Sequence, residues 1–93
     1  MTPPHVVDGA KILDWVWSGD VPFGHILNRE GAKICAVHGL AICAYAGDPR
    51  IYRFSCDRNW NVEQDAFHDS AAEAKTEVAQ LYPLSIAPWH TLE

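Results

Sequence analysis

The sequence has 93 residues, 48% of them hydrophobic and 20% charged, which is the composition of one small globular domain and not of a disordered chain. Seven Lys plus Arg against twelve Asp plus Glu give a net charge of −5, which argues against a general nucleic-acid or membrane-surface binder. No apolar run approaches the ~20 residues of a membrane-spanning helix, and the N-terminus lacks the cations of a secretory signal. We therefore expect a single cytoplasmic domain over residues 1–93.

Residues 10–17 fit two different structures. Asp8 would cap a helix here, and the apolar positions fall at i, i+1, i+4 and i+5 as on one helical stripe: Ile12, Leu13, Val16 and Trp17. The alternative is a strand, because tryptophan and valine are good strand formers. We favour a short N-terminal helix, followed by a turn or loop at residues 21–24.

The segment from Ala32 to Phe67 predicts a β-meander. A two-residue loop containing glycine, His38-Gly39, indicates a hairpin between the first two strands. The expected strands are 34–37, 40–46, 51–56 and 60–67, the last at an edge of the sheet because one of its faces is polar.

A helix over residues 70–82 is the clearest element. Ser70 and Glu73 form a capping box, and Pro83 stops the helix. One apolar stripe would face the core: Ala71, Ala74, Val78, Leu81 and Tyr82. The predicted fold is α+β, an antiparallel meander of three to four strands with this C-terminal helix packed on one face.

Alternation along the predicted strands makes both sheet faces largely apolar. The first face carries Ala41, Cys43, Tyr45, Tyr52, Phe54 and Cys56. A single C-terminal helix covers one face, so the other needs either the N-terminal segment or a second copy of the chain. We therefore expect a homo-oligomer, with a dimer favoured, whose interface contains Val37, Leu40, Ile42 and Ile51.

The three cysteines are odd in number and irregularly spaced, which indicates buried thiols in a reducing compartment. With His38 they make four soft ligands, but the spacing is not that of a zinc site, and the predicted register puts Cys35 and Cys43 on opposite faces. His68-Asp69-Ser70 contains the letters of a hydrolase triad, yet adjacent positions do not converge, and Ser70 is the helix cap. We expect no metal, no cofactor and no catalytic set.

Binding residues are expected among the charged and aromatic side chains of strands three and four. Arginine and tryptophan are enriched in binding sites, and the candidates for a partner or polar ligand are Arg50, Arg53, Asp57, Arg58, Trp60 and Glu63. The competing reading is a solvated sheet edge whose charges discourage pairing. A small-molecule enzyme is the rival function, with Asp57, Glu63 or Asp65 as acid or base and Arg50 or Arg53 as anion clamp.

The stretch 51–82 combines an aromatic strand, a tryptophan after a turn, an Asp-Ser cap and a Tyr-Pro stop. In these elements it resembles small uncharacterised bacterial single-domain proteins of the kind carried on integron gene cassettes. The resemblance implies an orphan bacterial protein, often oligomeric, and it carries over no catalytic residue. The sequence therefore predicts a small binding or interaction protein that acts on a protein partner or a small polar ligand.

Overall fold

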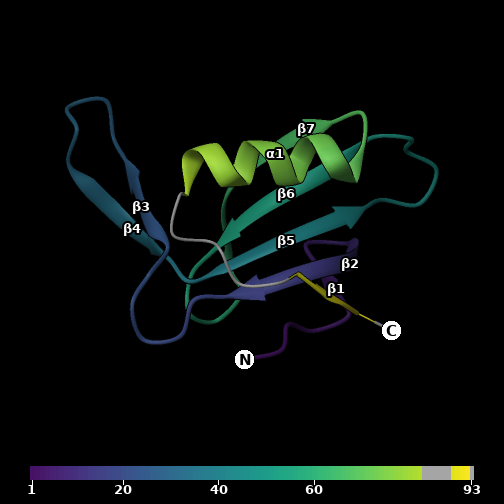
Figure 1. Ribbon diagram of the computed structural model, residues 1–93, viewed down its shortest axis with the longest axis horizontal. Helices are drawn as coiled ribbons and strands as arrows, with labels where there is room; N and C mark the ends of the chain where they lie inside the picture. Colours follow the sequence, from purple (N-terminus) through teal and green to yellow (C-terminus); the bar gives the residue numbers. More distant parts are fainter. Residues whose placement is uncertain (83–88, 93) are drawn as a thin grey trace.

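The computed structural model describes residues 1–82 and 89–92 (Figure 1). Within these ranges the chain forms eight strands and one helix. They are β1 (Val6–Val7), β2 (Ala10–Trp17), β3 (Gly24–Leu27), β4 (Lys33–Val37), β5 (Gly39–Ala44), β6 (Ile51–Cys56), β7 (Val62–His68), α1 (Ala71–Leu81) and β8 (His90–Thr91).

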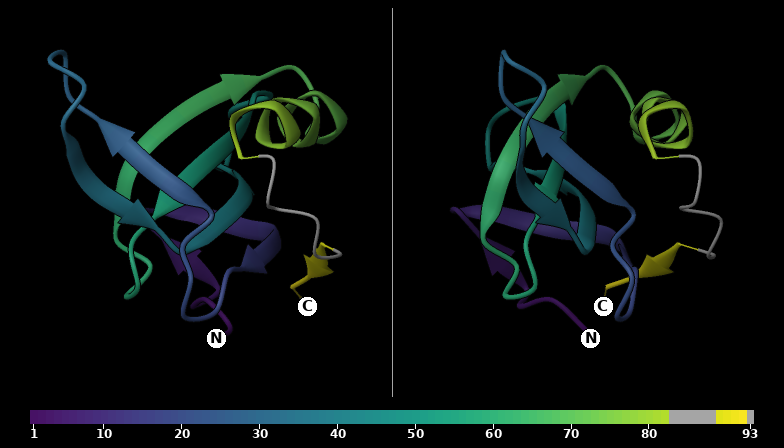
Figure 2. Two further views of the ribbon diagram at one scale, coloured as in Figure 1. Left: turned by 60° about the vertical axis from the view of Figure 1, so that its left-hand side comes forward. Right: turned by 90° about the vertical axis from the view of Figure 1, so that its left-hand side faces the viewer.

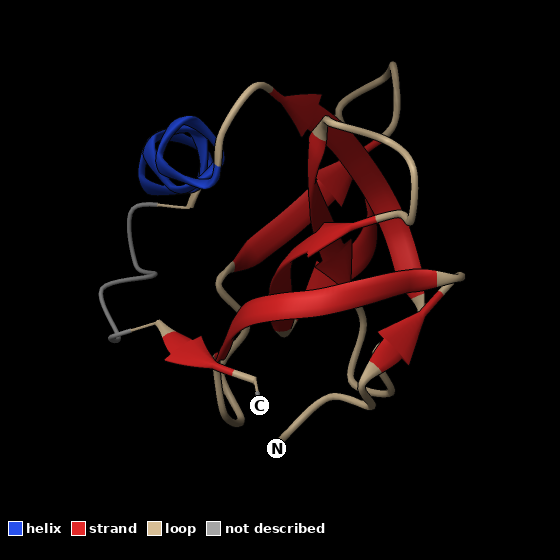
Figure 3. Ribbon diagram, turned by 90° about the vertical axis from the view of Figure 1, so that its right-hand side faces the viewer, coloured by secondary structure: helices blue, strands red, loops and turns tan. Residues whose placement is uncertain are grey.

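The main sheet is antiparallel and follows the order β1-β2-β5-β6-β7, with β8 added to β2. Strands β3 and β4 form a separate two-stranded hairpin that projects from one end of the molecule (Figure 1). The main sheet curls strongly, and α1 lies on one side of it (Figures 2 and 3). The predicted antiparallel sheet with one C-terminal helix is thus confirmed, although the sheet has more strands than expected.

The expected N-terminal helix is wrong, because residues 10–17 form strand β2. Its register against β5 shifts between Ile12 and Asp14, so Leu13 is an extra residue in a β-bulge. After the bulge Trp15 pairs with Ala41 and Val16 with Leu40. At the bulge, side chains on the same face of the sheet are three residues apart instead of two, and this spacing resembles that of a helix.

The hairpin expected at His38-Gly39 is also wrong. Strand β4 continues directly into β5 at this point. It pairs instead with β3, which lies in a segment where the sequence predicted no strand. The turn of this β3–β4 hairpin is organised by Asn28, whose side-chain oxygen accepts hydrogen bonds from the backbone N–H groups of Glu30 and Ala32 at 3.0 and 2.9 Å.

The remaining elements agree with the sequence. β6 spans the predicted residues, β7 lies at the sheet edge, and α1 begins after Ser70, whose hydroxyl accepts a hydrogen bond from the Glu73 N–H at 3.1 Å. The Glu73 carboxylate reaches back to the Asp69 N–H at 3.3 Å, which completes the cap. Helix α1 ends at Leu81 with Tyr82 as its C-cap, and Pro83 lies outside the described residues.

Both faces of the sheet are covered within one chain. On one face α1 packs with β2, β4 and β5 through Val16, Phe23, Val37, Leu40, Val78 and Tyr82. On the other face the curled sheet and the β6–β7 turn enclose a second cluster of Val7, Ala10, Ile12, Ala41, Cys43, Phe54, Cys56 and Trp60. Leu92, to which the sequence assigned no role, also packs against this second cluster.

This coverage corrects the argument for an interface. Val37, Leu40 and Ile42 have 0% exposed surface, and Ile51 is half-buried. Side chains without exposed surface contact no second copy in this fold. An uncovered apolar face therefore no longer supports oligomerisation, and any such contact must use another surface.

Candidate functional site

The structure separates the six predicted binding residues. Arg53 is buried beneath α1 and Trp60 lies in the core, so neither is free to contact a partner. Glu63 is exposed on β7. The remaining three predicted residues lie on two different surfaces. Arg50 lies beside a group of aromatic rings at the β5–β6 turn, and Asp57 and Arg58 line a pocket.

The aromatic surface consists of Tyr45, Arg50, Tyr52 and Phe67. The rings of Tyr45 and Tyr52 meet edge to face with centroids 5.1 Å apart, and Tyr52 lies 6.3 Å from Phe67. The Arg50 guanidinium stands over two of these rings, 5.7 Å from Tyr52 and 5.0 Å from Phe67, within the range of a cation–π contact. Phe67 nevertheless keeps 59% of its surface exposed.

Asp48 holds two members of this surface in place. Its carboxylate accepts hydrogen bonds from Arg50 Nε and Nη2, both at 3.1 Å, and from the Tyr52 hydroxyl at 2.9 Å. The hydrogen bonds from Arg50 and Tyr52 lower the pKa of Asp48 to about 2. The aromatic surface is therefore ordered before any partner arrives.

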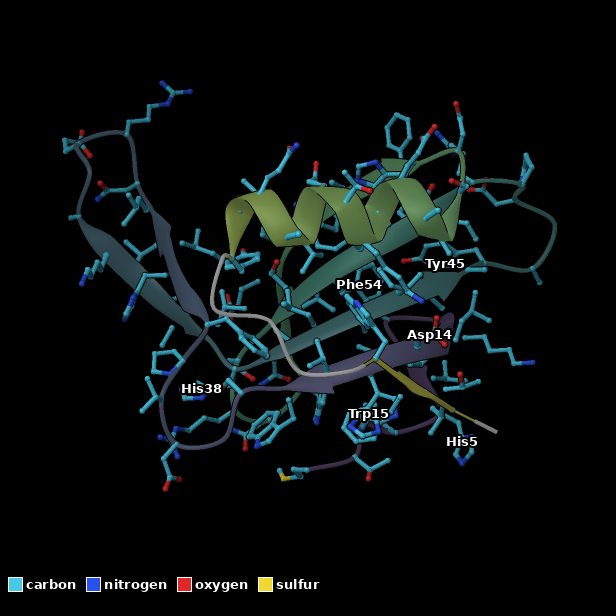
Figure 4. All side chains as sticks on the ribbon, viewed as in Figure 1. His5, Asp14, Trp15, His38, Tyr45 and Phe54 are labelled. Atoms are coloured by element: carbon cyan, nitrogen blue, oxygen red, sulfur yellow. The ribbon has the colours of Figure 1, made fainter. Side chains whose placement is uncertain are left out.

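A pocket of about 250 Å³, here called the His38 pocket, lies between the β3–β4 hairpin and the β6–β7 turn. It is lined by Cys35, Ala36, His38, Asp57, Arg58 and Asn59. Figure 4 labels His38 and Tyr45 in opposite halves of the molecule, and the pocket lining contains no residue of the aromatic surface, so the two are separate sites.

Most polar groups of the pocket are already engaged. His38 Nδ1 lies 3.0 Å from the Gly19 carbonyl oxygen, to which it donates, and 2.9 Å from Ser18 Oγ. The Asp57 carboxylate accepts the backbone N–H groups of Asn59 and Asn61 and the Asn61 side-chain amide at 2.8, 3.0 and 3.0 Å. Burial raises the pKa of Asp57, but these hydrogen bonds and the neighbouring His38 outweigh burial and leave it below its ordinary value.

The thiols are not activated nucleophiles. Burial, followed by nearby negative charges, raises the pKa of both Cys43 and Cys56 to about 12. Burial also raises the pKa of Cys35, with smaller contributions from Glu63 and Asp57. Although Cys35 and His38 both line the pocket, the raised pKa is the opposite of what a cysteine hydrolase requires.

Arg53 joins the sheet to α1 and does not form an anion clamp. Its Nε and Nη2 donate to Glu77 Oε1 at 3.1 and 2.8 Å, and its Nη1 donates to Ser55 Oγ at 2.6 Å. His68 Nε2 lies 3.2 Å from the same carboxylate oxygen of Glu77. Burial raises the pKa of Glu77, yet the hydrogen bonds from Arg53 and the proximity of His68 bring it below its ordinary value.

Trp60 closes the core and adopts a left-handed backbone with φ of 62°. Its ring contacts Trp15 and Trp17 at centroid distances of 6.3 and 5.6 Å and covers Gly39, where an added Cβ would lie 2.6 Å from the ring. Its buried indole N–H has no hydrogen-bond partner within the described part of the chain. Packing in the core therefore explains the position of Trp60, which the sequence indicated as a binding residue.

The structure does not bring together the acid, base and anion-clamp residues of the alternative enzyme function. Asp57 is engaged in its turn, Glu63 and Asp65 are exposed on β7, and Arg53 is paired with Glu77. These groups do not converge on a common pocket. Across residues 1–82 and 89–92, no cluster of three or more His, Cys, Asp or Glu side chains is arranged to hold a metal ion.

No helix in the described ranges is long and apolar enough to span a bilayer. Comparison with known proteins gives no match to a family model, to a curated protein or to a solved structure.

The sequence reasoning missed most of the aromatic surface. Tyr45 and Tyr52 flank the turn at residues 47–50, and their positions on either side of it signalled that the rings would meet. Phe67 lies opposite Tyr52 in the β6–β7 register. Among the four residues of this surface, the sequence indicated only Arg50 as a binding residue, on the basis of its charge.

Proposed function

We propose that this protein is a binding protein that recognises a protein partner through the aromatic surface. The observation that carries the proposal is the exposed ring of Phe67 beside Arg50 and Tyr52, which Asp48 fixes in place. Free cysteines over the described residues support the further proposal of a cytoplasmic location.

The composition of this surface is that of a binding hot spot. Tyrosine and arginine are among the residues that dominate interface energies, and they do so where their conformations are already ordered. The hydrogen bonds of Asp48 restrict Arg50 and Tyr52 before binding. Less conformational entropy is then lost when a partner arrives, so the same contact area gives a higher affinity.

The charges around the rings favour a partner with basic contact residues. Asp65 lies two residues before Phe67 on the same face of β7, and Asp8 precedes Gly9, where an added Cβ would lie 3.8 Å from the Tyr45 ring. Burial is the main cause of a raised pKa at Tyr45, and both carboxylates add to it. Arg50 is already neutralised by Asp48 at 3.1 Å. Asp8 and Asp65 therefore give the aromatic surface an acidic rim, in a chain whose net charge is −5.

Affinity capture followed by direct titration tests the proposal. The wild-type chain and the Phe67→Ala variant would be immobilised in parallel, and proteins bound to only one of them identified by mass spectrometry. A partner retained by the wild-type chain alone would then be purified and titrated by calorimetry. We expect Phe67→Ala to weaken its binding about 30-fold, corresponding to a hot-spot loss of roughly 2 kcal/mol.

Leu81→Ala is the matched control, because Leu81 is a similarly exposed apolar side chain at the end of α1. It should leave the dissociation constant unchanged within about twofold. Rising salt should weaken the wild-type complex, since the acidic rim faces a basic partner. Equal capture of the partner by the wild-type chain and by Phe67→Ala would contradict the assignment of the aromatic surface.

A second proposal concerns self-association through the β3–β4 hairpin. Residues 27–34 are all exposed, and Leu27 and Ile34 keep 54% and 63% of their surface. Arg29 and Lys33 have no ion-pair partner among the described residues, whereas the rest of the chain is acidic, so a second copy is the complementary occupant. Ile34→Asp should convert a dimer to a monomer in sedimentation velocity; a monomeric wild-type chain would contradict this proposal.

A further inference from the structure

The His38 pocket has two chemically different sides. Ala36 and Cys35 of β4 supply an aliphatic wall, and the β6–β7 turn supplies Arg58 and Asn59. Burial keeps the Cys35 thiol neutral, because it raises the pKa of this group. The pocket therefore joins an uncharged side to a polar side that holds the donors of Arg58 and Asn59 beside the Asp57 carboxylate.

Arg58 is the cationic group of the pocket, and most of its donors are unused. A guanidinium has five N–H donors, and the bond from Nη2 to the Asp20 carbonyl oxygen, at 3.3 Å, occupies one of them. Asp57, in contrast, already accepts three N–H donors, and His38 Nδ1 is bonded to a backbone carbonyl. What the pocket lacks is an acceptor for Arg58.

The charge balance limits the acceptor to a single negative charge. Asp57 and Arg58 have opposite charges in the same lining, and the whole chain carries −5. Arg58 can compensate one negative charge on the ligand, whereas each additional charge would add uncompensated repulsion from Asp57 and the acidic chain. A carboxylate also matches the planar fork of a guanidinium, with which it forms two parallel hydrogen bonds.

We propose that the His38 pocket binds a short aliphatic monocarboxylate. Its carboxylate accepts hydrogen bonds from Arg58, and its alkyl group lies against Ala36 and Cys35. A volume of about 250 Å³ equals about eight water molecules at their ~30 Å³ share, which suits an acid of about three to five carbons. This site is independent of the aromatic surface and does not rest on the proposed partner.

Two-dimensional ¹H–¹⁵N NMR of the labelled full chain tests the proposal, with sodium propionate as the probe and sodium chloride at equal ionic strength as the reference. We expect saturable shifts in the amides of residues 35–38 and 57–59, with a dissociation constant in the millimolar range. Shifts of the same size in chloride, or shifts spread over the surface, would overturn the proposal.

Two further probes test the chemistry of recognition. Propionamide has the same shape without the charge, and inorganic phosphate has more charge without the alkyl group. Each should bind at least fivefold more weakly than propionate. Equal binding of propionamide would contradict carboxylate recognition, and tighter binding of phosphate would contradict the role of the aliphatic wall.

Arg58→Ala should weaken propionate binding at least tenfold, and since Arg58 is exposed, the variant is expected to fold. Arg29→Ala is the control, because Arg29 is equally exposed and lies in the turn of the β3–β4 hairpin. An unchanged affinity in Arg58→Ala, in a chain whose remaining amide spectrum matches the wild type, would overturn the site. Ala36→Val, which narrows the aliphatic wall, should weaken propionate more than formate.

Discussion

Replacing Glu77 by glutamine should destabilise the protein far more than the loss of an ordinary surface ion pair. Arg53 is only 3% exposed, and its guanidinium donates to Glu77 through two nitrogens. The variant keeps the shape of the side chain but leaves a buried cation without its counter-charge. Breaking a buried pair by removing one partner costs about 3–5 kcal/mol.

Solvent reduces this cost, because the Glu77 side chain is 29% exposed. We therefore expect Glu77→Gln to lower the free energy of unfolding by about 2–3 kcal/mol. In a chain of this size such a loss lowers Tm by about 10–20 °C. Urea unfolding followed by circular dichroism measures the change, with an unaltered m-value if the unfolded state is the same.

Lys75→Met is the matched control on the same helix. Lys75 Nζ lies 2.7 Å from the Asp14 carboxylate, but the lysine side chain is 33% exposed, so its loss should cost less than about 1 kcal/mol. If Glu77→Gln costs no more than this control, the account of Arg53 as a buried connection between sheet and helix is refuted.

Three further predictions concern pH, the thiols and the core. Because the folded pKa of Glu77 is lowered, its contribution to stability is present above the unfolded pKa of about 4.3 and is lost as pH falls through the folded value; unfolding at pH 2–6 should show a shallower pH dependence in Glu77→Gln. A thiol reagent at pH 8 should modify Cys35 alone without unfolding, since the other two cysteines are buried; rapid modification of all three would contradict their burial. Gly39→Ala should cost about 1–3 kcal/mol and change tryptophan fluorescence, because its Cβ would meet Trp60 at 2.6 Å; a change below 0.5 kcal/mol would show that the ring moves aside freely.

The elements that the sequence predicted well are those with local signals. The Ser70 cap and the three- and four-residue spacing placed α1 within one residue, because a helix is built from neighbours along the chain. The assignment of Ala41, Cys43 and Phe54 to one sheet face was also right, and the two strands that flank the turn at residues 47–50 do pair with each other. The alternation of side chains between the two faces of a strand does not depend on which strand it pairs with.

The errors came from contacts between segments far apart in the sequence. The sequence predicts a turn at Gly39, but this glycine is covered by the ring of Trp60, about twenty positions away. The bulge at Leu13 altered the apolar spacing of β2, and only the pairing with β5 reveals it. The binding candidates failed in the same way, since the position of Glu77 on α1 decides that Arg53 is buried and paired.

A photo-crosslinking comparison tests the central claim, that the aromatic surface is the partner site, most directly. A photoreactive benzoyl-phenylalanine would replace Phe67 in one chain and Leu81 in another, because both positions are exposed but Leu81 belongs to α1, on the other face of the sheet. Irradiation with the captured partner should give one adduct of defined mass from position 67 and none from position 81. Adducts of equal yield from both positions, or none from position 67, would contradict the account.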